Sequence, residues 1–487
     1  MITTLVLAFA LQASDLEAAV ANASSLGDKG QFAAAVSTLE DAGVTDSQDA
    51  GAWHAYATWG TRQLENDIAA GRIAGLEIVD EFMEMAWRLE KASQCTDAPV
   101  QVWVDWSEVL LNANDIPNSL KTLEDGLSTF RNDALLLAQR GRVQLAKARA
   151  AKDNGNEESA AELKQAAEAS FRKAISSAPK SAAPRLRLAE LLWLDYLEGG
   201  AKSEPLKKQA LESWVAAASN DPEGVDPNVL YQWLGTESVP VYDKLIEAQP
   251  EQVLHYWYRG SAFYALGPDN WPKLRDDFLK VLEINPDFSN AYYFLADGAM
   301  QRGKQQSTSG DQATAERAYS AAAGFWAEYL KGFGNQYRMQ LKQAGGDGGW
   351  SVAQNMNWLA GKKDYETGIV LLRWAVGTIP DYSDAWNNLA YFLRETGESE
   401  ASRDAYQRAL ELQPTDPQVM NDYAVIFHYY LKERLDYAEE LYIQAAERAQ
   451  EMLDNNEVAE EDMQRITIAL RDAKNNLRKL QKGETEE

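Results

Sequence analysis

The residue types that most often carry out catalysis are scarce and widely separated in this chain. Its three histidines, His54, His255 and His428, lack the spacing of a metal site, and its one cysteine, Cys95, excludes an intramolecular disulfide and a thiolate cluster. No phosphate-binding loop, dinucleotide-binding glycine motif or nucleophile elbow occurs. Carboxylates are abundant, but at this density a pair of them is far more often a solvated helix face than a catalytic dyad. We therefore expect no enzymatic activity, no metal and no cofactor.

The charge of the chain constrains its partners. Lys and Arg number 47 and Asp and Glu number 74, so the net charge is −27. A surface this acidic repels phosphate backbones and anionic lipid headgroups, which disfavours nucleic acid and membrane surfaces as ligands. It favours a protein or peptide, including a basic one. The content of 45% hydrophobic and 25% charged residues indicates a folded chain, and 487 residues exceed one ordinary core.

The elements that must position any site are most visible in residues 384–414, DAWNNLAYFLRETGESEASRDAYQRALELQP. Apolar residues recur at helical spacing from Trp386 to Leu393, and Gly397 ends that helix. A second amphipathic helix with Tyr406 on its apolar face ends before Pro414. Such a helical hairpin leaves its apolar stripe in water unless neighbouring hairpins cover it.

The same pattern recurs along the chain with a period of 34 residues. A step of 34 leads back from Trp386 to Val352 and forward to Met420, and earlier copies open at Trp53, Trp103 and Tyr292. Large, Leu and small residues in the first helix, followed by Ala, an aromatic residue, Ala and Pro in the second, resemble the tetratricopeptide repeat family. The resemblance implies an all-α, right-handed α-solenoid of about eleven helical hairpins with a C-terminal capping helix.

The periodicity divides the chain into five segments. The apolar run from Leu5 to Leu11 favours a short signal peptide, which predicts export to the periplasm or the medium. No membrane-spanning segment would then be left after cleavage. The alternative is that this run is the first packing helix of a cytoplasmic protein. Insertions inside repeats are expected around 65–80, 147–164, 198–208 and 303–312. KDNGNEES and GKQQSTSGDQ are polar and loop-like, whereas NDIAAGRIAGLEIVDEF could lengthen helices. The segments are a signal peptide over 1–13, copies one to eight over 16–330, a glycine-containing linker or hinge over 331–348, copies nine to eleven over 349–450 and a capping helix over 455–482.

In proteins that resemble this one, the first helices of successive repeats line a concave groove that holds an extended peptide or a partner helix. The matching positions of copies five to eight are aromatic: Trp193, Trp233, Trp257, Tyr264 and Tyr293. Those of copies nine to eleven are mainly polar: Asn357, Asn387, Tyr391, Arg394, Asn421 and His428. Aromatic residues could instead fill space between helices, and His428 could be structural. No Lys stands among the C-terminal positions, so the Lys, Asn and Arg clamp with which some family members hold a terminal carboxylate is not predicted.

Three functions remain compatible with this pattern. The resemblance favours a non-catalytic scaffold or adaptor that binds a protein or peptide in its groove. The aromatic positions would also suit a module that binds carbohydrate or a cell-envelope polymer, because sugar rings stack on aromatic side chains. An accessory subunit of an enzyme complex is the third. Neither the partner nor the oligomeric state can be deduced from the residues.

Overall fold

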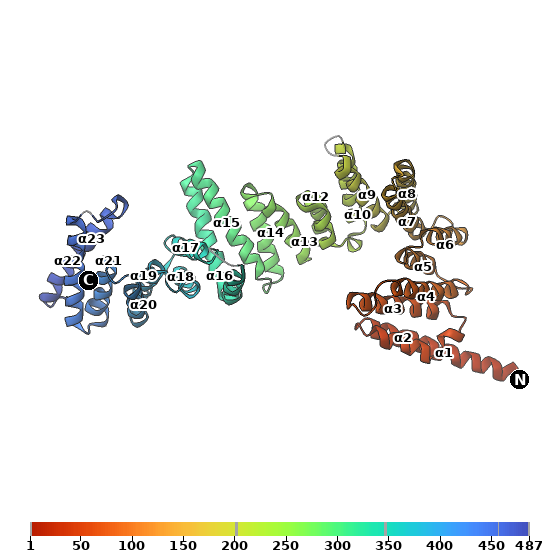
Figure 1. Cartoon of the computed structure of the whole chain (residues 1–487), viewed down its shortest axis with the longest axis horizontal. Helices are drawn as coiled ribbons and strands as arrows, with labels where there is room; N and C mark the ends of the chain where they lie inside the picture. The colour runs from red at the N-terminus through yellow and green to blue at the C-terminus, as the bar shows by residue number, and fades with distance from the viewer. Residues whose placement is uncertain (1, 200–202, 345–347, 456, 486–487) are drawn as a thin grey trace. The chain divides into compact units, whose positions relative to one another are not determined.

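The computed structural model describes residues 2–199, 203–344, 348–455 and 457–485. Within these ranges the chain is α-helical with short 3-10 turns and contains no strand. Contacts divide it into unit 1, Met1–Trp233 with Pro240–Pro250, and unit 2, Leu234–Val239 with Glu251–Glu487. Each unit is an α-solenoid in which helices that are consecutive in sequence pack as antiparallel hairpins (Figure 1). The predicted all-α repeat fold is confirmed.

Unit 1 holds the N-terminal hairpins. Its helices are α1 (Ile2–Gly27), α2 (Phe32–Asp41), α3 (Ala50–Ala69), α4 (Glu77–Ser93), α5 (Gln101–Asn112), α6 (Ile116–Thr129), α7 (Ala134–Asp153), α8 (Glu157–Ser177), α9 (Ala183–Gly199), α10 (Glu204–Asn220), α11 (Pro227–Leu234) and α12 (Val239–Ala248). First helices of neighbouring hairpins also contact one another, as α5 contacts α7 and α7 contacts α9. Each hairpin therefore covers the apolar stripe of the next.

Unit 2 holds the C-terminal hairpins and the last helix. Its helices are α13 (Val253–Ala265), α14 (Trp271–Ile284), α15 (Asn290–Ser309), α16 (Gln312–Ala344), α17 (Gly348–Ala360), α18 (Tyr365–Thr378), α19 (Ser383–Glu395), α20 (Ser399–Leu412), α21 (Pro417–Val425), α22 (Leu435–Asp454) and α23 (Met463–Gln481). A π-helical turn, η6 (Ile426–Leu431), follows α21. Lys432 and Arg434, both in left-handed conformation, connect this turn to α22.

Small residues in the first helix of a hairpin let an aromatic residue of the second helix approach its backbone. A Cβ at Gly141 of α7 would overlap the buried ring of Phe171 of α8, and a Cβ at Gly303 of α15 would overlap the ring of Tyr319 of α16. The small and aromatic positions of the repeat pattern therefore interlock within one hairpin. Only glycine permits so close a contact without displacing the ring.

Aspartates begin several of these helices. The side chains of Asp49, Asp133, Asp364 and Asp416 accept hydrogen bonds from backbone N–H groups in the first turns of α3, α7, α18 and α21. Such caps satisfy donors that a helix N-terminus leaves unpaired and place negative charge at the positive end of the helix dipole. Part of the acidic composition thus has a structural role.

The predicted linker over 331–348 is helical as far as it can be followed. Helix α16 continues to Ala344, and residues 345–347 lie outside the described ranges. Gly334 lies against Trp374, whose Nε1 donates a hydrogen bond 3.3 Å long to the carbonyl oxygen of Gly334. This glycine therefore makes room for a tryptophan of α18.

The insertions inside repeats lengthen helices more than they form loops. Helices α7 and α8 absorb most of 147–164, and α15 runs through Ser309. The polar stretches that were expected to be loops contain only short turns, around Gly155 and Gly310, which both have positive φ. Exposed Lys, Gln and Glu are good helix formers, so a polar composition did not imply a loop. Part of the insertion at 198–208 lies outside the described residues.

The two ends of the chain are helical. Residues 2–13, the predicted signal peptide, are part of α1, and none of the described helices is long and apolar enough to cross a membrane. At the other end α23 packs on α22 and α21 and buries Ile466, Ala469 and Ala473. Helix α23 thus covers the last hairpin, as expected for a capping helix.

Candidate partner-binding surfaces

A groove of about 820 Å³ lies along the C-terminal repeats of unit 2. We call it the asparagine groove. Its lining includes Asn357 of α17, Asp384, Asn387 and Asn388 of α19, Asp416 before α21, Arg448 of α22 and Arg465 of α23. Helices α17, α19, α22 and α23 and the residue before α21 thus bring polar side chains to one surface.

The amides of the groove form a chain of hydrogen bonds between helices. Asn388 Nδ2 donates to Asn357 Oδ1 over 2.9 Å, and Asn357 Nδ2 donates to the hydroxyl of Tyr382 over 3.4 Å. Each amide has two donors and an acceptor oxygen with two lone pairs, so these bonds use only part of their capacity. The groove can therefore accept further donors and acceptors.

Two polar atoms of groove-lining residues are buried without a hydrogen-bond partner among the described residues. They are Oδ1 of Asn387 and Nε of Arg448. The remaining guanidinium nitrogens of Arg448 bond Glu451 over 2.8 Å and Glu457 over 3.0 Å. A buried polar atom without a partner costs free energy, so packing alone does not explain why Asn387 occupies this position.

Both arginines that line the groove are held in ion pairs. Arg465 bonds Asp416 over 2.8 Å and Asp462 over 3.2 Å, while Asp416 also caps α21. The lining also contains the uncharged amides of Asn357, Asn387, Asn388 and Gln418. These amides can both donate and accept hydrogen bonds.

A second cavity, of about 610 Å³, lies farther along unit 2 between α19, α21 and α23. We call it the cationic pocket, lined by Arg394, Asn421, Asp422, Asp472, Asn475, Asn476, Arg478, Lys479, Lys482 and Glu484. Asn476 Nδ2 donates to Asn421 Oδ1 over 3.1 Å, and Asn421 Nδ2 donates to Asp422 over 3.0 Å. Burial raises the pKa of Asp422 to about 6, although the hydrogen bond from Asn421 and the charge of Arg394 act to lower it.

Four of the six predicted C-terminal groove positions line one of these two cavities, and Tyr391 and His428 line neither. Asn357 and Asn387 line the asparagine groove, whereas Arg394 and Asn421 line the cationic pocket. Tyr391 lines neither, because its hydroxyl lies 3.2 Å from that of Tyr365 and its ring lies under the guanidinium of Arg394.

His428 is fully buried. Its Nδ1 lies 3.3 Å from the Tyr442 hydroxyl, and its Nε2 lies 2.7 Å from the carbonyl oxygen of Glu484. Burial lowers the pKa of His428, partly offset by the contact with Glu484. Of the two roles considered for His428, the structure supports the structural one.

The predicted aromatic positions in unit 1 do not form an open patch. Trp193 of α9 is buried and packs edge-on against Trp214 of α10 with ring centroids 5.7 Å apart. Its placement corrects the expectation of a groove-facing side chain, because the helix face that carries it is covered by the second helix of its own hairpin. Trp233, at the end of α11, is half-buried.

The aromatic positions in unit 2 lie in aromatic clusters between helices. Trp257 contacts Phe278, Phe288 and Phe294, with centroids 4.7–5.3 Å apart. Tyr293 contacts Trp326, Tyr329 and Tyr337. These rings remain half-buried, but much of their surface is used for packing.

Tyr264 differs from its neighbours because its hydroxyl is engaged in a polar network. It donates to Asp297 over 2.6 Å, and Gln301 Nε2 bonds both Asp297 and the tyrosine oxygen. Burial and the bond to Asp297 raise the pKa of Tyr264. Through this hydrogen bond the Tyr264 side chain connects α13 to α15.

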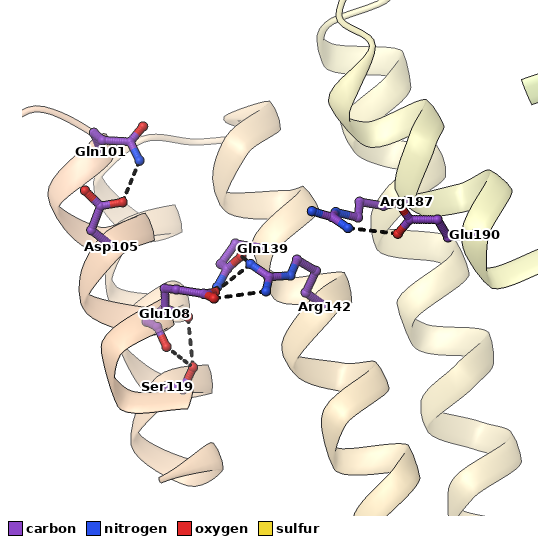
Figure 2. Close-up of polar contacts among 9 residues, drawn as sticks. Gln101, Asp105, Glu108, Ser119, Gln139, Arg142, Arg187 and Glu190 are labelled. Carbon is purple, nitrogen blue, oxygen red and sulfur yellow. Dashed lines mark hydrogen bonds and ion pairs between the residues drawn. The ribbon is translucent and has the colours of Figure 1, made fainter. Parts of the chain in front are cut away.

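Unit 1 contains a polar surface that the sequence analysis did not single out. Figure 2 shows Glu108 of α5 reaching Gln139 and Arg142 of α7, with Arg142 bonding both carboxylate oxygens over 2.6 and 3.0 Å. Next to it, Asp105 bonds Gln101 and His54, each over 2.7 Å. The repeat spacing that predicted the groove positions in copies five to eleven would also have predicted His54 and Glu108 if it had been applied to the earlier copies.

No described group of three His, Cys, Asp or Glu side chains is arranged to hold a metal ion. The surfaces above are instead suited to hydrogen bonding and ion pairing with a macromolecule.

A tetratricopeptide repeat model matches residues 383–416, which hold α19 and α20. No curated protein matches the chain. Among solved structures, it is similar to a chain of the APC/C hetero-tetramer Cut9-Hcn1, with 14% identity over 93% of this chain and 95% of that chain and a TM-score of 0.22. It is also similar to yeast Tom70, with 15% identity over 96% of this chain and 97% of that chain and a TM-score of 0.23. A third similar structure is the C-terminal part of a TPR repeat-containing protein from Cytophaga hutchinsonii, with 14% identity over 66% of this chain and 98% of that chain and a TM-score of 0.28. At these values the similarities identify neither a partner nor an activity. Residues 383–416 thus match a tetratricopeptide repeat, and helical hairpins of the same kind flank this repeat on either side.

Proposed function

We propose that this protein is a non-catalytic scaffold that binds an extended segment of a partner protein in the asparagine groove. The observation that carries the proposal is the pair of amides, Asn357 and Asn388, joined across neighbouring first helices with hydrogen-bonding capacity left over. An extended backbone presents alternating N–H and C=O groups, and an Asn side chain can bond both. The repeat fold supports a role in protein interaction in general.

Asn387 adds a second argument. Its buried Oδ1 has no partner within the described structure, and Asn is a poorer helix former than Ala. Asn387→Ala should therefore leave the stability of the fold unchanged or raise it, and at the same time weaken partner binding. A side chain that costs stability is typical of a binding surface.

The test begins with peptides selected from a random phage-displayed library on the immobilised protein. Their affinities are then measured by fluorescence anisotropy for wild type, Asn387→Ala and Asn357→Ala/Asn388→Ala. We expect each variant to lose about tenfold or more, equivalent to about 1.4 kcal/mol. Asn154→Ala, which removes an exposed amide of unit 1, is the matched control and should bind like wild type.

Salt provides a further criterion. Because the amides that would bind the partner's backbone are uncharged, affinity should fall little as ionic strength rises. If wild type and the groove variants bound the peptides with equal affinity, the asparagine groove would not be the binding site. The same holds if high salt alone abolished binding, because the site would then lie on the charged surfaces.

Carbohydrate binding is the second candidate, and one observation favours it. Trp350 of α17 is exposed, and its ring packs against Tyr382, whose hydroxyl accepts the hydrogen bond from Asn357. An aromatic face beside amides is suited to a sugar ring. Quenching of tryptophan fluorescence by soluble glycans, lost in Trp350→Ala, would favour this function over peptide binding.

Export to the periplasm or the medium is a separate proposal and depends on removal of residues 1–13. The mass of the mature N-terminus tests it directly. Retention of Met1 or Ile2 in the native protein would favour the cytoplasmic alternative.

A further inference from the structure

Helix α4 in unit 1 carries an apolar stripe that faces solvent. Its members are Leu76, which is 85% exposed, and Val79, Met83 and Trp87, which are 38–41% exposed. They follow one another at steps of three, four and four residues, which places them on one side of the helix. Isolated exposed apolar residues are ordinary, but four in a row on one helix are not.

The fold itself does not use this stripe as its core. The buried residues of α4 are Phe82, Met85, Ala86, Leu89 and Ala92, on a different face that packs against α3 and α5. Trp87 only touches Trp53 with one ring edge, with centroids 5.5 Å apart. Leu76 precedes the first turn of α4, in the insertion that enlarges this repeat.

The charges along the stripe are mainly negative. Glu77, Asp80 and Glu84 are exposed beside it on α4. Arg88 is not available to oppose a basic partner, because its guanidinium lies 3.7 Å over the ring of Tyr56 and its side chain is 11% exposed. Its Nε bonds Glu84 over 3.3 Å, so Glu84 is already paired within α4, whereas Glu77 and Asp80 carry the negative charge beside the stripe. Lys91, 5.7 Å above the ring of Trp87, is the basic residue at the end of the stripe.

We propose that this stripe of α4 docks a basic amphipathic helix of a partner protein. The apolar side of such a helix would cover Leu76, Val79, Met83 and Trp87, and its Lys or Arg residues would meet Glu77 and Asp80. From residue 76 to residue 87 the stripe spans about 17 Å, a little over three helical turns. A second copy is disfavoured as occupant because it would oppose like charges in a chain of net charge −27.

The test uses a fluorescein-labelled model peptide of about 18 residues with Leu on one helical face and Lys on the other. Two further peptides serve as comparisons: a scrambled Leu/Lys peptide of the same composition and a Leu/Glu amphipathic helix. Binding is measured by anisotropy to the full-length protein and to Leu76→Ser/Met83→Ser, Glu77→Gln/Asp80→Asn and the control Ile443→Ser, which alters an equally exposed apolar residue of α22 in unit 2. Circular dichroism verifies that each variant is folded.

The Leu/Lys helix should bind at least about tenfold more tightly than both comparison peptides. Leu76→Ser/Met83→Ser should lose about tenfold, Glu77→Gln/Asp80→Asn should lose affinity and salt dependence, and Ile443→Ser should change neither. Equal binding of the scrambled peptide would mean unspecific attraction to an acidic protein and would overturn the proposal. A dimer in sedimentation velocity that Leu76→Ser/Met83→Ser dissociates would overturn it in favour of a second copy.

Discussion

The contact between Gly303 and Tyr319 allows a quantitative test of how these hairpins pack. In Gly303→Ala the new methyl group would overlap the ring of Tyr319, which is 5% exposed. The ring cannot move away easily, since Trp358 lies edge-on against it with centroids 4.3 Å apart. Overpacking of this kind costs about 1–3 kcal/mol, while replacing Gly by Ala inside a helix stabilises by up to about 1 kcal/mol. The net loss should be about 1–2 kcal/mol.

Gly332→Ala provides the matched control in the same hairpin. Gly332 lies within α16, is exposed, and a Cβ there would meet no atom within 4 Å. The helix-propensity gain then acts alone, so this variant should be stabilised by about 0.5–1 kcal/mol. The same chemical change is expected to have opposite signs at the two sites.

Urea unfolding followed by far-UV circular dichroism measures both effects. With a denaturant slope of about 3 kcal/mol/M, the midpoint should fall by about 0.3–0.7 M for Gly303→Ala and rise by about 0.2–0.3 M for Gly332→Ala. Amide exchange should show the loss of protection concentrated in α15 and α16, because a repeat contacts only its neighbours. Equal stabilisation by both substitutions would refute the inferred interlock.

Two further predictions concern ionisable groups. Because burial raises the folded-state pKa of Asp422 from 3.8 to about 6, the native state holds the extra proton in that window and loses stability as pH rises through it. Asp422→Asn should therefore raise the free energy of unfolding by about 1–3 kcal/mol at neutral pH and by much less at acid pH. If the stability difference between variant and wild type were the same at both pH values, the raised pKa of Asp422 would be contradicted. Glu108→Gln should cost at most about 1 kcal/mol because about a third of both its own side chain and that of Arg142 is exposed, and high salt should reduce the difference between the unfolding midpoints.

The hairpins, their order and their register are readable in the residues alone. The spacing of Trp386, Leu389 and Leu393 predicts the apolar side of α19, and the buried Leu389 and Leu393 bear it out. Periodicity succeeds here because a repeat buries the same positions each time. It is less informative about lengths, since α16 continues through glycines that resembled a linker.

The candidate site could be predicted only in part. Asn357 and Asn387 were identified from the repeat frame, but Asn388, Arg448 and Arg465 line the same groove from positions the frame does not mark. The fold also places the basic end of α23 at the cationic pocket, which the repeat frame does not predict. These groups come from helices far apart in sequence.

The sequence by itself determined which face of each helix is apolar, because that depends on spacing along one chain segment. Only the tertiary structure decided what covers each face: Trp193 is buried and packs against Trp214, whereas Trp87 remains 41% exposed. It also decided that Asn421 meets Asn476, 55 residues later. A helix face presents the same side chains whether its neighbour is a second helix, a partner or water, so the physical outcome depends on packing between segments that no local pattern encodes.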